Sequence, residues 1–196
     1  MRSQTAFFNS VAANWDTMCN HDMKKVEFIL DLLKIEEGQQ ILDVGTGTGI
    51  LIPSLVRRVG TKGKIVGVDL AEKMIEVARA KNTFNNVIFK CEDVLEHEPC
   101  GVGYDVVICY SMFPHFEDKE KAIIMLSKKL KANGQLIICH SESRQAINNM
   151  HQKANESVKE DHLPTAEKIK QYFVQAHLKV TEELDTQEIF LVMGTK

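Results

Sequence analysis

The feature that most constrains this chain is a run of alternating glycines directly after an apolar segment. Residues 40–44 form an apolar, strand-like run, Gly45, Gly47 and Gly49 follow, and a helical pattern begins at residue 50. This order predicts a strand, a tight turn and a helix, the first unit of a doubly wound α/β sheet. Glycine adopts backbone angles closed to residues with a Cβ, so the chain can approach a ligand closely at Gly45 and Gly47. We expect backbone N–H groups at the start of the helix to face that ligand.

The spacing of the glycines separates two kinds of nucleotide-binding fold. A dinucleotide fingerprint is G-x-G-x-x-G, whereas this loop is G-x-G-x-G and has Ile50 where the third glycine would fall. The run Asp43-Val44-Gly45-Thr46-Gly47-Thr48-Gly49 resembles the first motif of class I methyltransferases, which use S-adenosylmethionine. The resemblance extends over most of the chain and is nearest to the ubiquinone/menaquinone-biosynthesis type. The alternatives are a glycine turn in another α/β protein, a nicotinamide oxidoreductase, and a module that binds the cofactor without turnover.

An acidic residue follows at the distance that such a cofactor site requires. The apolar run 64–68 predicts a second strand, and Asp69 stands at its carboxyl end, where ligands of these sheets bind. A carboxylate there can accept hydrogen bonds from both hydroxyls of a ribose. Asp69 could instead be the N-cap of the next helix. The glycine loop and the downstream acid together are more specific than either alone.

The resemblance implies S-adenosylmethionine as the cofactor and S-adenosylhomocysteine as the product. It assigns Asp69 to the ribose, Asp93 to the adenine amino group, and Leu70 and Met74 to the two faces of the adenine ring. The residues expected to bind the cofactor are Trp15, Asp43, Gly45, Thr46, Gly47, Gly49, Asp69, Leu70, Met74, Asp93, Val94 and Tyr110.

The N-terminal segment has helical spacing and precedes the predicted sheet. Its pattern Phe8-x-x-x-Ala12-x-x-Trp15-Asp16 resembles the lid of quinone-biosynthesis-type methyltransferases. In that family an aromatic residue before an Asp closes over the methionine end of the cofactor. Trp15 is therefore expected to contact cofactor, and packing in the core is its alternative role.

The remaining patterns complete a Rossmann-like fold. The run 104–110 is apolar in its centre, as a strand covered by helices on both faces should be. A helix is expected over 117–130, with Gly134 as its C-cap and a fifth strand over 136–139. An antiparallel hairpin closes the chain. The prediction is a seven-stranded sheet in the order 3-2-1-4-5-7-6, with strand 7 antiparallel.

We expect a single domain over residues 1–196. Its parts are an N-terminal helical lid over 1–36 and a cofactor-binding α/β core over 37–196. A hydrophilic segment over 140–163 interrupts the core, and we expect it to form the wall of the substrate site.

Three polar residues follow central strands and are the candidates for catalysis. His115 and His140 would each leave the carboxyl end of a strand, and Tyr110 ends the predicted fourth strand. A general base is needed only if the acceptor must lose a proton, and either imidazole can serve. Tyr110 would orient the acceptor. The alternative for both histidines is a position in the core or on the surface without a role.

A metal site is a further hypothesis, although the main expectation is that no metal is used. His151 and His162 are eleven residues apart, so one continuous helix would place them on the same face. With either candidate base they could ligate a divalent ion, assisted by Glu142 or Asp161. No dense motif such as HExxH supports this set. The alternative is a solvated polar lid.

Composition limits the class of partner. The net charge is −3 and no basic patch is evident, which favours a small-molecule acceptor over nucleic acid. No apolar run is long enough to span a membrane, no signal peptide is evident, and the five cysteines are scattered, so a cytoplasmic protein is expected. After the fourth strand, residues 111–113 lack the arginine–asparagine pattern usual in quinone-type enzymes. The acceptor and the oligomeric state are therefore not indicated.

Overall fold

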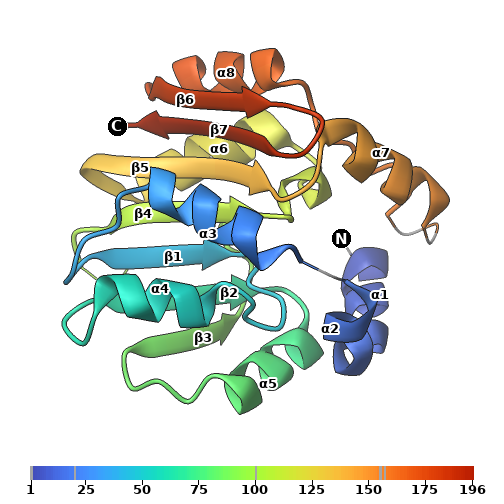
Figure 1. Ribbon diagram of the computed structural model, residues 1–196, viewed down its shortest axis with the longest axis horizontal. Coiled ribbons are helices and arrows are strands. Elements are labelled where there is room, and N and C mark those ends of the chain that lie inside the picture. Colours follow the sequence, from blue (N-terminus) through green and yellow to red (C-terminus); the bar gives the residue numbers. More distant parts are fainter. Residues whose placement is uncertain (1, 20, 100, 155, 157) are drawn as a thin grey trace. The chain divides into compact units, whose positions relative to one another are not determined.

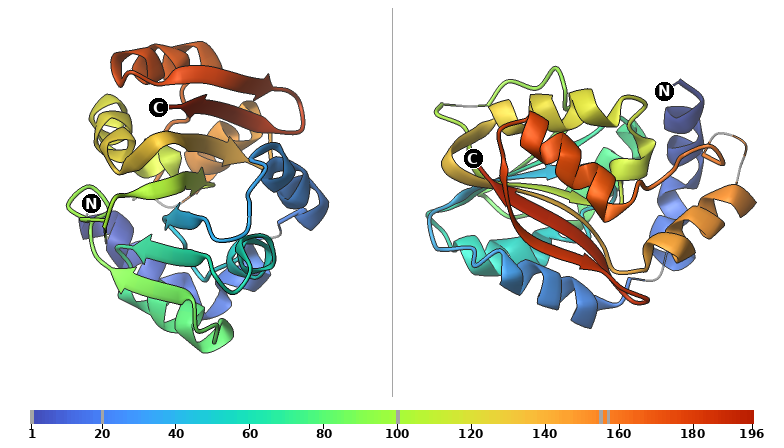
Figure 2. Two further views of the ribbon diagram at one scale, coloured as in Figure 1. Left: turned by 90° about the vertical axis from the view of Figure 1, so that its left-hand side faces the viewer. Right: turned by 90° about the horizontal axis from the view of Figure 1, so that it is seen from above.

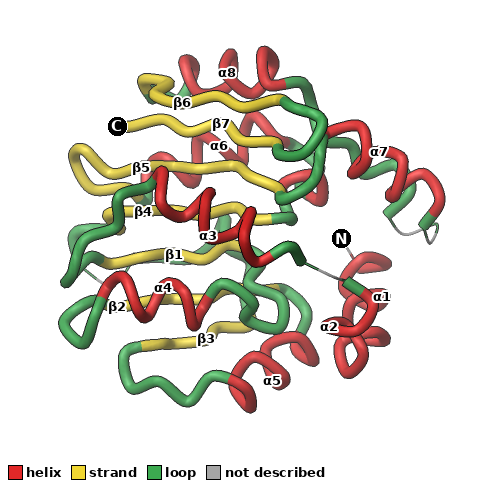
Figure 3. Tube along the Cα trace, in the orientation of Figure 1, coloured by secondary structure: helices red, strands yellow, loops and turns green. Residues whose placement is uncertain are grey.

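The computed structural model describes residues 2–19, 21–99, 101–154, 156 and 158–196. The described residues form one sheet of seven strands in the order β3-β2-β1-β4-β5-β7-β6 (Figure 1, Figure 3). Strand β7 runs antiparallel to its neighbours β5 and β6. The predicted Rossmann-like sheet and its strand order are thereby confirmed. The chain divides into two compact units, Met1–Glu98 and Pro99–Lys196, so one domain with a lid and a core stays a prediction.

The first unit is built on three parallel strands, which follow the predicted apolar runs. Their bounds are β1 Gln40–Val44, β2 Lys64–Asp69 and β3 Val87–Cys91. Val44 is paired with Val68, so the carboxyl ends of β1 and β2 lie at the same edge. Because of this register, the loop that follows β1 begins beside Asp69, the last residue of β2.

The first unit contains five α-helices and one 3-10 helix among its described residues, and α3 begins at a side-chain cap. Their bounds are α1 Arg2–Val11, the 3-10 helix η1 Ala12–Asn14, α2 Trp15–Met18, α3 Met23–Leu32, α4 Ile52–Val59 and α5 Glu72–Lys81. Asp22 caps α3 by accepting hydrogen bonds from the N–H groups of Lys24 and Lys25. Helices α3 and α4 lie side by side, joined by the ion pair of Glu27 with Arg58 at 2.7 Å (Figure 1, Figure 2).

The second unit contains the other four strands and the helices between them. Its strands are β4 Tyr104–Tyr110, β5 Leu130–His140, β6 Lys179–Asp185 and β7 Phe190–Thr195. Its helices are the 3-10 helix η2 Phe113–His115, α6 Lys119–Lys128, α7 Arg144–Lys153 and α8 Ala166–Gln175. Helices α6 and α8 pack against each other, and they contact β5 and the β6–β7 hairpin respectively (Figure 2). Side chains of Asp118, Ser143 and Thr165 cap α6, α7 and α8.

Strand β5 differs from the prediction, which placed a helix C-cap at Gly134. The strand already begins at Leu130, and its pairing with β4 shifts register between Tyr104 and Val106. Gly134 is needed for close backbone approach, because a Cβ there would lie 2.9 Å from the carbonyl oxygen of Tyr104. The left-handed residue of this stretch is Asn133, with φ of 62°. The C-cap prediction is therefore wrong.

Helix α7 lies inside the hydrophilic segment 140–163, which was expected to form the wall of the substrate site. Its apolar side is short, and Ile147 is its buried hydrophobic residue. Within the described ranges, no helix combines the length and the apolar character that crossing a membrane requires.

Candidate functional site

The glycine loop of the first unit has an open face and a packed face. Gly45, Gly47 and Gly49 all have positive φ, at 63°, 54° and 82°. A Cβ on Gly47 would have no neighbour nearer than Nε1 of Trp15, at 4.0 Å. A Cβ on Gly49 would instead lie 2.6 Å from Nδ2 of Asn82. The loop therefore uses Gly49 to pack on the end of α5 and leaves Gly47 accessible to a ligand.

Asp69 ties the glycine loop to the end of β2. Its Oδ2 accepts a hydrogen bond from the N–H of Gly47 at 2.9 Å, and its Oδ1 accepts from the N–H of Ala71 at 2.8 Å. The N-cap of α5 is Ala71, so the alternative of Asp69 as N-cap does not hold. The carboxylate is half-buried, and carboxylate oxygens are the acceptors that ribose hydroxyls require.

Asp43 is a buried carboxylate directly before the loop. Its Oδ2 accepts a hydrogen bond from Oγ1 of Thr46 at 2.6 Å, and the N–H of Thr46 donates to the carbonyl of Val68 at 3.0 Å. Burial raises the pKa of Asp43 to about 7; the Thr46 hydrogen bond opposes this rise and the charge of Asp69 adds to it. Through its contact with Thr46, Asp43 therefore stabilises the conformation of the glycine loop. The carboxyl group of Asp43 gains or loses its proton near neutral pH.

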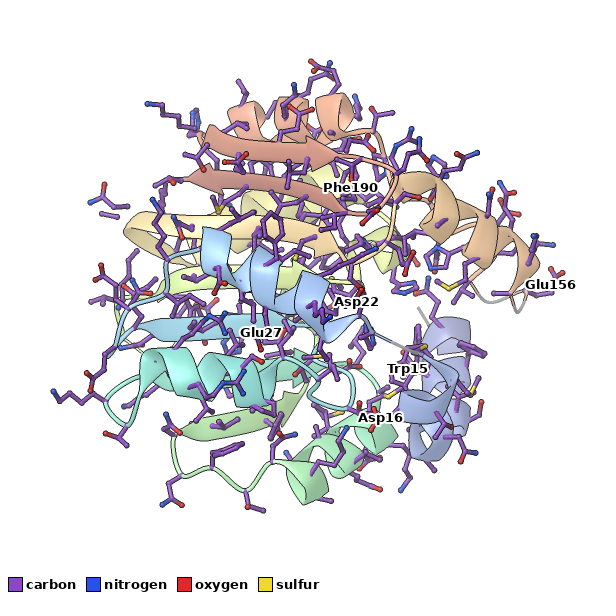
Figure 4. The ribbon with its side chains drawn as sticks, in the orientation of Figure 1. Trp15, Asp16, Asp22, Glu27, Glu156 and Phe190 are labelled. Carbon is purple, nitrogen blue, oxygen red and sulfur yellow. The ribbon has the colours of Figure 1, made fainter. Side chains whose placement is uncertain are left out.

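The predicted lid packs on the helix that follows Asp69. Ala12 and Met74 are buried in one cluster with Ala71, against which Phe8 and Trp15 pack. Trp15 and Asp16 begin the short helix α2 (Figure 4). The contact between the N-terminal segment and α5 is thus apolar at its centre.

Polar contacts also hold the N-terminal segment against the glycine loop and α5, at Asp16 and at Asn9. Oδ1 of Asp16 accepts a hydrogen bond from Oγ1 of Thr48 at 2.5 Å, and Oδ2 is paired with Nζ of Lys81. We call Asp16, Thr48 and Lys81 the Asp16 clasp. At the other end, Oδ1 of Asn9 accepts from the N–H of Lys73 at 2.9 Å and supplies the side-chain cap that α5 lacks locally. Contacts this far apart in the chain leave no local signal. Asp16 and Thr48 each belonged to a predicted motif, but neither motif indicated that they would pair.

The residues predicted for the adenine lie beyond β2 and β3 in the same unit. Leu70 is exposed, whereas Met74 is 2% exposed and belongs to the cluster under the lid. Oδ1 of Asp93 accepts from the N–H of Leu95 at 2.8 Å, and Val94 is buried. Their contacts with adenine stay predictions, and Leu70 has more surface to offer a ring than Met74.

In the second unit, Tyr110 is a buried residue at the end of β4. Its hydroxyl shares a 2.8 Å hydrogen bond with Oγ of Ser141, which follows β5. Burial raises the pKa of Tyr110 to about 12, so the phenol is neutral at physiological pH. Tyr110 can orient a polar group but is a poor base, and its cofactor contact stays a prediction. Sequence reasoning missed Ser141, although its place after a central strand was a usable signal.

Three histidines and one aspartate form a cluster in the second unit. Nδ1 of His115 and Oδ2 of Asp161 are 2.6 Å apart, and Nδ1 of His151 donates to the main-chain carbonyl of Asp161 at 3.0 Å. The rings of His115 and His151 have centroids 5.2 Å apart. His140 is 1% exposed, and neither ring nitrogen has a hydrogen-bond partner among the described residues. Burial, reinforced by the charges of His115 and His151, lowers the pKa of His140 to about 3.

The metal hypothesis lacks a ligand set. Helix α7 ends at Lys153, so His151 and His162 are not on one continuous helix, and that expectation is wrong. His162 is exposed. In the part of the chain that the structure describes, no group of three or more His, Cys, Asp or Glu residues could hold a metal ion. Asp161, which was considered only as an assisting ligand, instead holds two histidines.

Comparison with known proteins supports the reading of the glycine loop. The model of the methyltransferase domain family matches residues 35–187, which include the glycine loop, Asp69 and the histidine cluster. The chain belongs to the class I S-adenosylmethionine-dependent methyltransferase family. The family prediction made from the glycine loop is thereby confirmed.

Curated relatives of this methyltransferase chain include enzymes with different acceptors in their names. A malonyl-[acyl-carrier protein] O-methyltransferase of Acetivibrio thermocellus is 35% identical over 131 residues, 66% of this chain and 46% of the relative. A ubiquinone/menaquinone biosynthesis C-methyltransferase of Vibrio parahaemolyticus is 33% identical over 141 residues, 67% of this chain and 54% of the relative. The chain thus spans about half the length of the curated relatives it matches.

Solved structures share the fold of this methyltransferase chain. A SAM-dependent methyltransferase from Aquifex aeolicus superposes with a TM-score of 0.73 at 21% identity, covering 95% of this chain and 97% of that one. The N-methyltransferase NodS from Bradyrhizobium japonicum, in complex with S-adenosyl-L-homocysteine, gives a TM-score of 0.74 at 15% identity, covering 97% of each chain. At these identities the likeness establishes the fold alone.

Proposed function

We propose that this chain transfers a methyl group from S-adenosylmethionine to a small-molecule acceptor. The observation that carries the proposal is the position of Asp69. Its carboxylate ends β2 and holds the N–H of Gly47, whose open face adjoins Trp15. A half-buried carboxylate beside an accessible glycine backbone suits a ligand with a ribose next to a charged amino-acid moiety.

The residues of the first unit fit this cofactor. Backbone at Gly45 and Gly47 would receive the methionine moiety, Asp69 would accept hydrogen bonds from the ribose, and Asp93 with Leu70 would contact the adenine. When bound, the cofactor supplies an activated methyl group on a sulfonium, which is a good leaving group. The protein must then bind and orient the acceptor, exclude water and, where the acceptor requires it, remove a proton.

The acceptor is inferred to be a small molecule on two grounds. The chain's net charge is −3, which gives no electrostatic field that favours nucleic acid. Two relatives carry the names of a quinone-biosynthesis enzyme and of an acyl-carrier-protein methyltransferase. Location in the cytoplasm and the absence of a nucleic-acid partner stay predictions.

Release of S-adenosylhomocysteine tests the proposal. The whole chain would be incubated with S-adenosylmethionine and a panel of hydroxyl, carboxyl, amine, thiol and carbon acceptors, with product measured by mass spectrometry. We expect release with at least one class, and a large loss in Asp69→Ala. Asp31→Ala is the matched control, because Asp31 is an exposed carboxylate of the same unit whose partner is Arg58.

Two outcomes contradict the proposal in different ways. Binding of S-adenosylmethionine without release of product from any acceptor would leave a binding module without turnover. Binding of a nicotinamide dinucleotide in its place would overturn the cofactor assignment.

A further inference from the structure

A tight turn after β3 carries Asp93, for which a contact with the adenine was proposed above. The N–H of Glu92, which precedes Asp93, donates to the carbonyl of Asp69 at 3.1 Å. The turn therefore begins beside the carboxyl end of β2, next to the carboxylate assigned to the ribose. All residues of this turn, 92–97, belong to the first unit. The position of Asp93 relative to Asp69 is thus set within that unit.

Hydrogen bonds within the turn hold Asp93 itself. Its Oδ1 accepts from the N–H of Leu95 at 2.8 Å, and its carbonyl accepts from the N–H of Glu96 at 3.0 Å. Asp93 is half-buried, and its Oδ2 has no hydrogen-bond partner among the described residues. One carboxylate oxygen thus fixes the side chain, and the other can accept from an N–H donor of a ligand.

The two ends of the turn are joined by His97 and Glu92. Nδ1 of His97, whose side chain is fully buried, lies 2.5 Å from Oε1 of the partly exposed Glu92. Nζ of Lys90 lies 3.6 Å from the same oxygen. Burial would raise the pKa of Glu92, but the contacts with His97 and Lys90 outweigh it and hold that pKa below its usual range. Glu92 is therefore a carboxylate at neutral pH, and it accepts the Nδ1 proton of His97.

The contact between His97 and Glu92 spans the residues that would meet the adenine. Asp93 and the buried Val94 lie between its two partners in the chain. The contact closes the turn at its base, so both residues are held in place before a cofactor arrives. A site that is ordered in advance binds more tightly, because the ligand does not have to order its side chains.

We propose that Glu92 and His97 are positioning residues of the adenine site, and that they set, through Asp93, a preference for a purine with a 6-amino group. This inference rests on the proposed function. The amino group donates to Oδ2 of Asp93, and the contact between Glu92 and His97 holds that oxygen in place. Loss of the contact therefore weakens recognition of the amino group more than recognition of the ribose by Asp69.

Calorimetry with three ligands separates positioning from a general structural role. The ligands are S-adenosylhomocysteine, its analogue with purine in place of adenine, which lacks the amino group, and its 2′-deoxy analogue, which lacks one ribose hydroxyl. The whole wild-type chain should prefer S-adenosylhomocysteine to the purine analogue by about 10–100-fold. Glu92→Ala should lower this preference by about 2–10-fold and leave the preference over the 2′-deoxy analogue unchanged.

Matched variants identify the route of the effect. Glu92→Gln keeps an acceptor for His97 and should retain both preferences; a loss as large as in Glu92→Ala would contradict the role of this hydrogen bond. Glu76→Ala removes an exposed carboxylate of the same unit, paired with Lys73 at 2.7 Å, and should also retain both preferences. In an Asp93→Ala background, Glu92→Ala should not lower the preference for the amino group further, because Glu92 acts through Asp93.

Hydrogen exchange measures the turn in the absence of cofactor. The N–H groups of Leu95 and Glu96 donate to Asp93, and they should exchange about 3–10-fold faster in Glu92→Ala than in the wild type. The N–H of Ile65 in β2 should exchange at the same rate in both. Unchanged exchange at Leu95 and Glu96 would contradict the positioning role.

Three binding results would overturn the inference and leave the proposed function intact. The first is a wild type that binds S-adenosylhomocysteine and the purine analogue equally. The second is an unchanged preference for the amino group in Glu92→Ala. The third is an equal fall in the preference over the 2′-deoxy analogue, which indicates a general structural role. Failure of the wild type to bind S-adenosylhomocysteine would instead overturn the proposed function, and this inference with it.

Discussion

Replacement of Asp43 by Asn should change how the stability of the first unit depends on pH. Burial raises the pKa of Asp43 to about 7, from 3.8 in an unfolded chain. Between these values the folded protein keeps a proton that the unfolded chain has lost. The folded state therefore binds more protons, and the free energy of unfolding falls as pH rises through this window.

The size of this effect follows from the shift in pKa. About three pKa units at 1.36 kcal/mol each correspond to about 4 kcal/mol over the whole window. We expect about 3 kcal/mol of this between pH 4.5 and 8. Asn cannot ionise and its Oδ1 can still accept the hydrogen bond from Thr46, so Asp43→Asn should lack this part of the pH dependence.

Urea unfolding followed by tryptophan fluorescence measures the effect. Trp15 is the only tryptophan and belongs to the same unit as Asp43. Between pH 4.5 and 8, the wild-type midpoint should fall relative to that of Asp43→Asn by about 1–3 M urea. The quantity compared is the change of the urea midpoint with pH. Any effect of the amide in Asp43→Asn on stability that does not depend on pH cancels in this comparison.

Thr46→Val is the matched variant. It removes the hydrogen bond that opposes the rise in the pKa of Asp43, so the fall in stability should extend to higher pH than in the wild type. Parallel curves for wild type and Asp43→Asn between pH 4.5 and 8 would refute the argument from burial.

Three further predictions concern the loop and the lid. Gly49→Ala should destabilise the protein by about 1–3 kcal/mol in urea unfolding, because its Cβ would lie 2.6 Å from Nδ2 of Asn82; an unchanged midpoint would show that the loop can shift. Emission from Trp15 should change when S-adenosylhomocysteine binds, since Nε1 lies beside the glycine loop, and constant emission at saturation would remove Trp15 from the site. Asp16→Asn should change the free energy of unfolding by less than about 1 kcal/mol, because its ion pair with Lys81 is exposed, yet speed proteolysis of the N-terminal segment; equal cleavage rates would contradict the clasp.

The sequence predicted correctly those strands that are marked by one clear local pattern, a continuous apolar run. The strands over residues 40–44 and 104–110 have the predicted bounds, because continuous apolar runs with clear ends specify buried strands. Asp69 is the last residue of its strand, as expected. The start of β5 was missed because its lysine, asparagine and glycine look like a turn, and the pairing of Leu130 with Tyr104 of β4 leaves no local pattern in the sequence.

Contacts between distant residues could not be predicted in the same way. Asp16 meets Lys81 across 65 residues, and His115 meets Asp161 across 46. Each residue alone is an ordinary charged or polar side chain. The apolar run 104–110 predicted that His115 follows the end of a strand, but its partner came from a segment with no periodic signal. The structure supplied the pairing.

Isothermal titration calorimetry with S-adenosylhomocysteine tests the central claim most directly. The wild type should bind, and Asp69→Asn should bind about 10–100-fold more weakly, because a charge-assisted hydrogen bond contributes about 1.5–3 kcal/mol. Asp31→Asn should bind like the wild type. Equal affinity in wild type and Asp69→Asn, or no binding by the wild type, would contradict a cofactor site built on the glycine loop and Asp69.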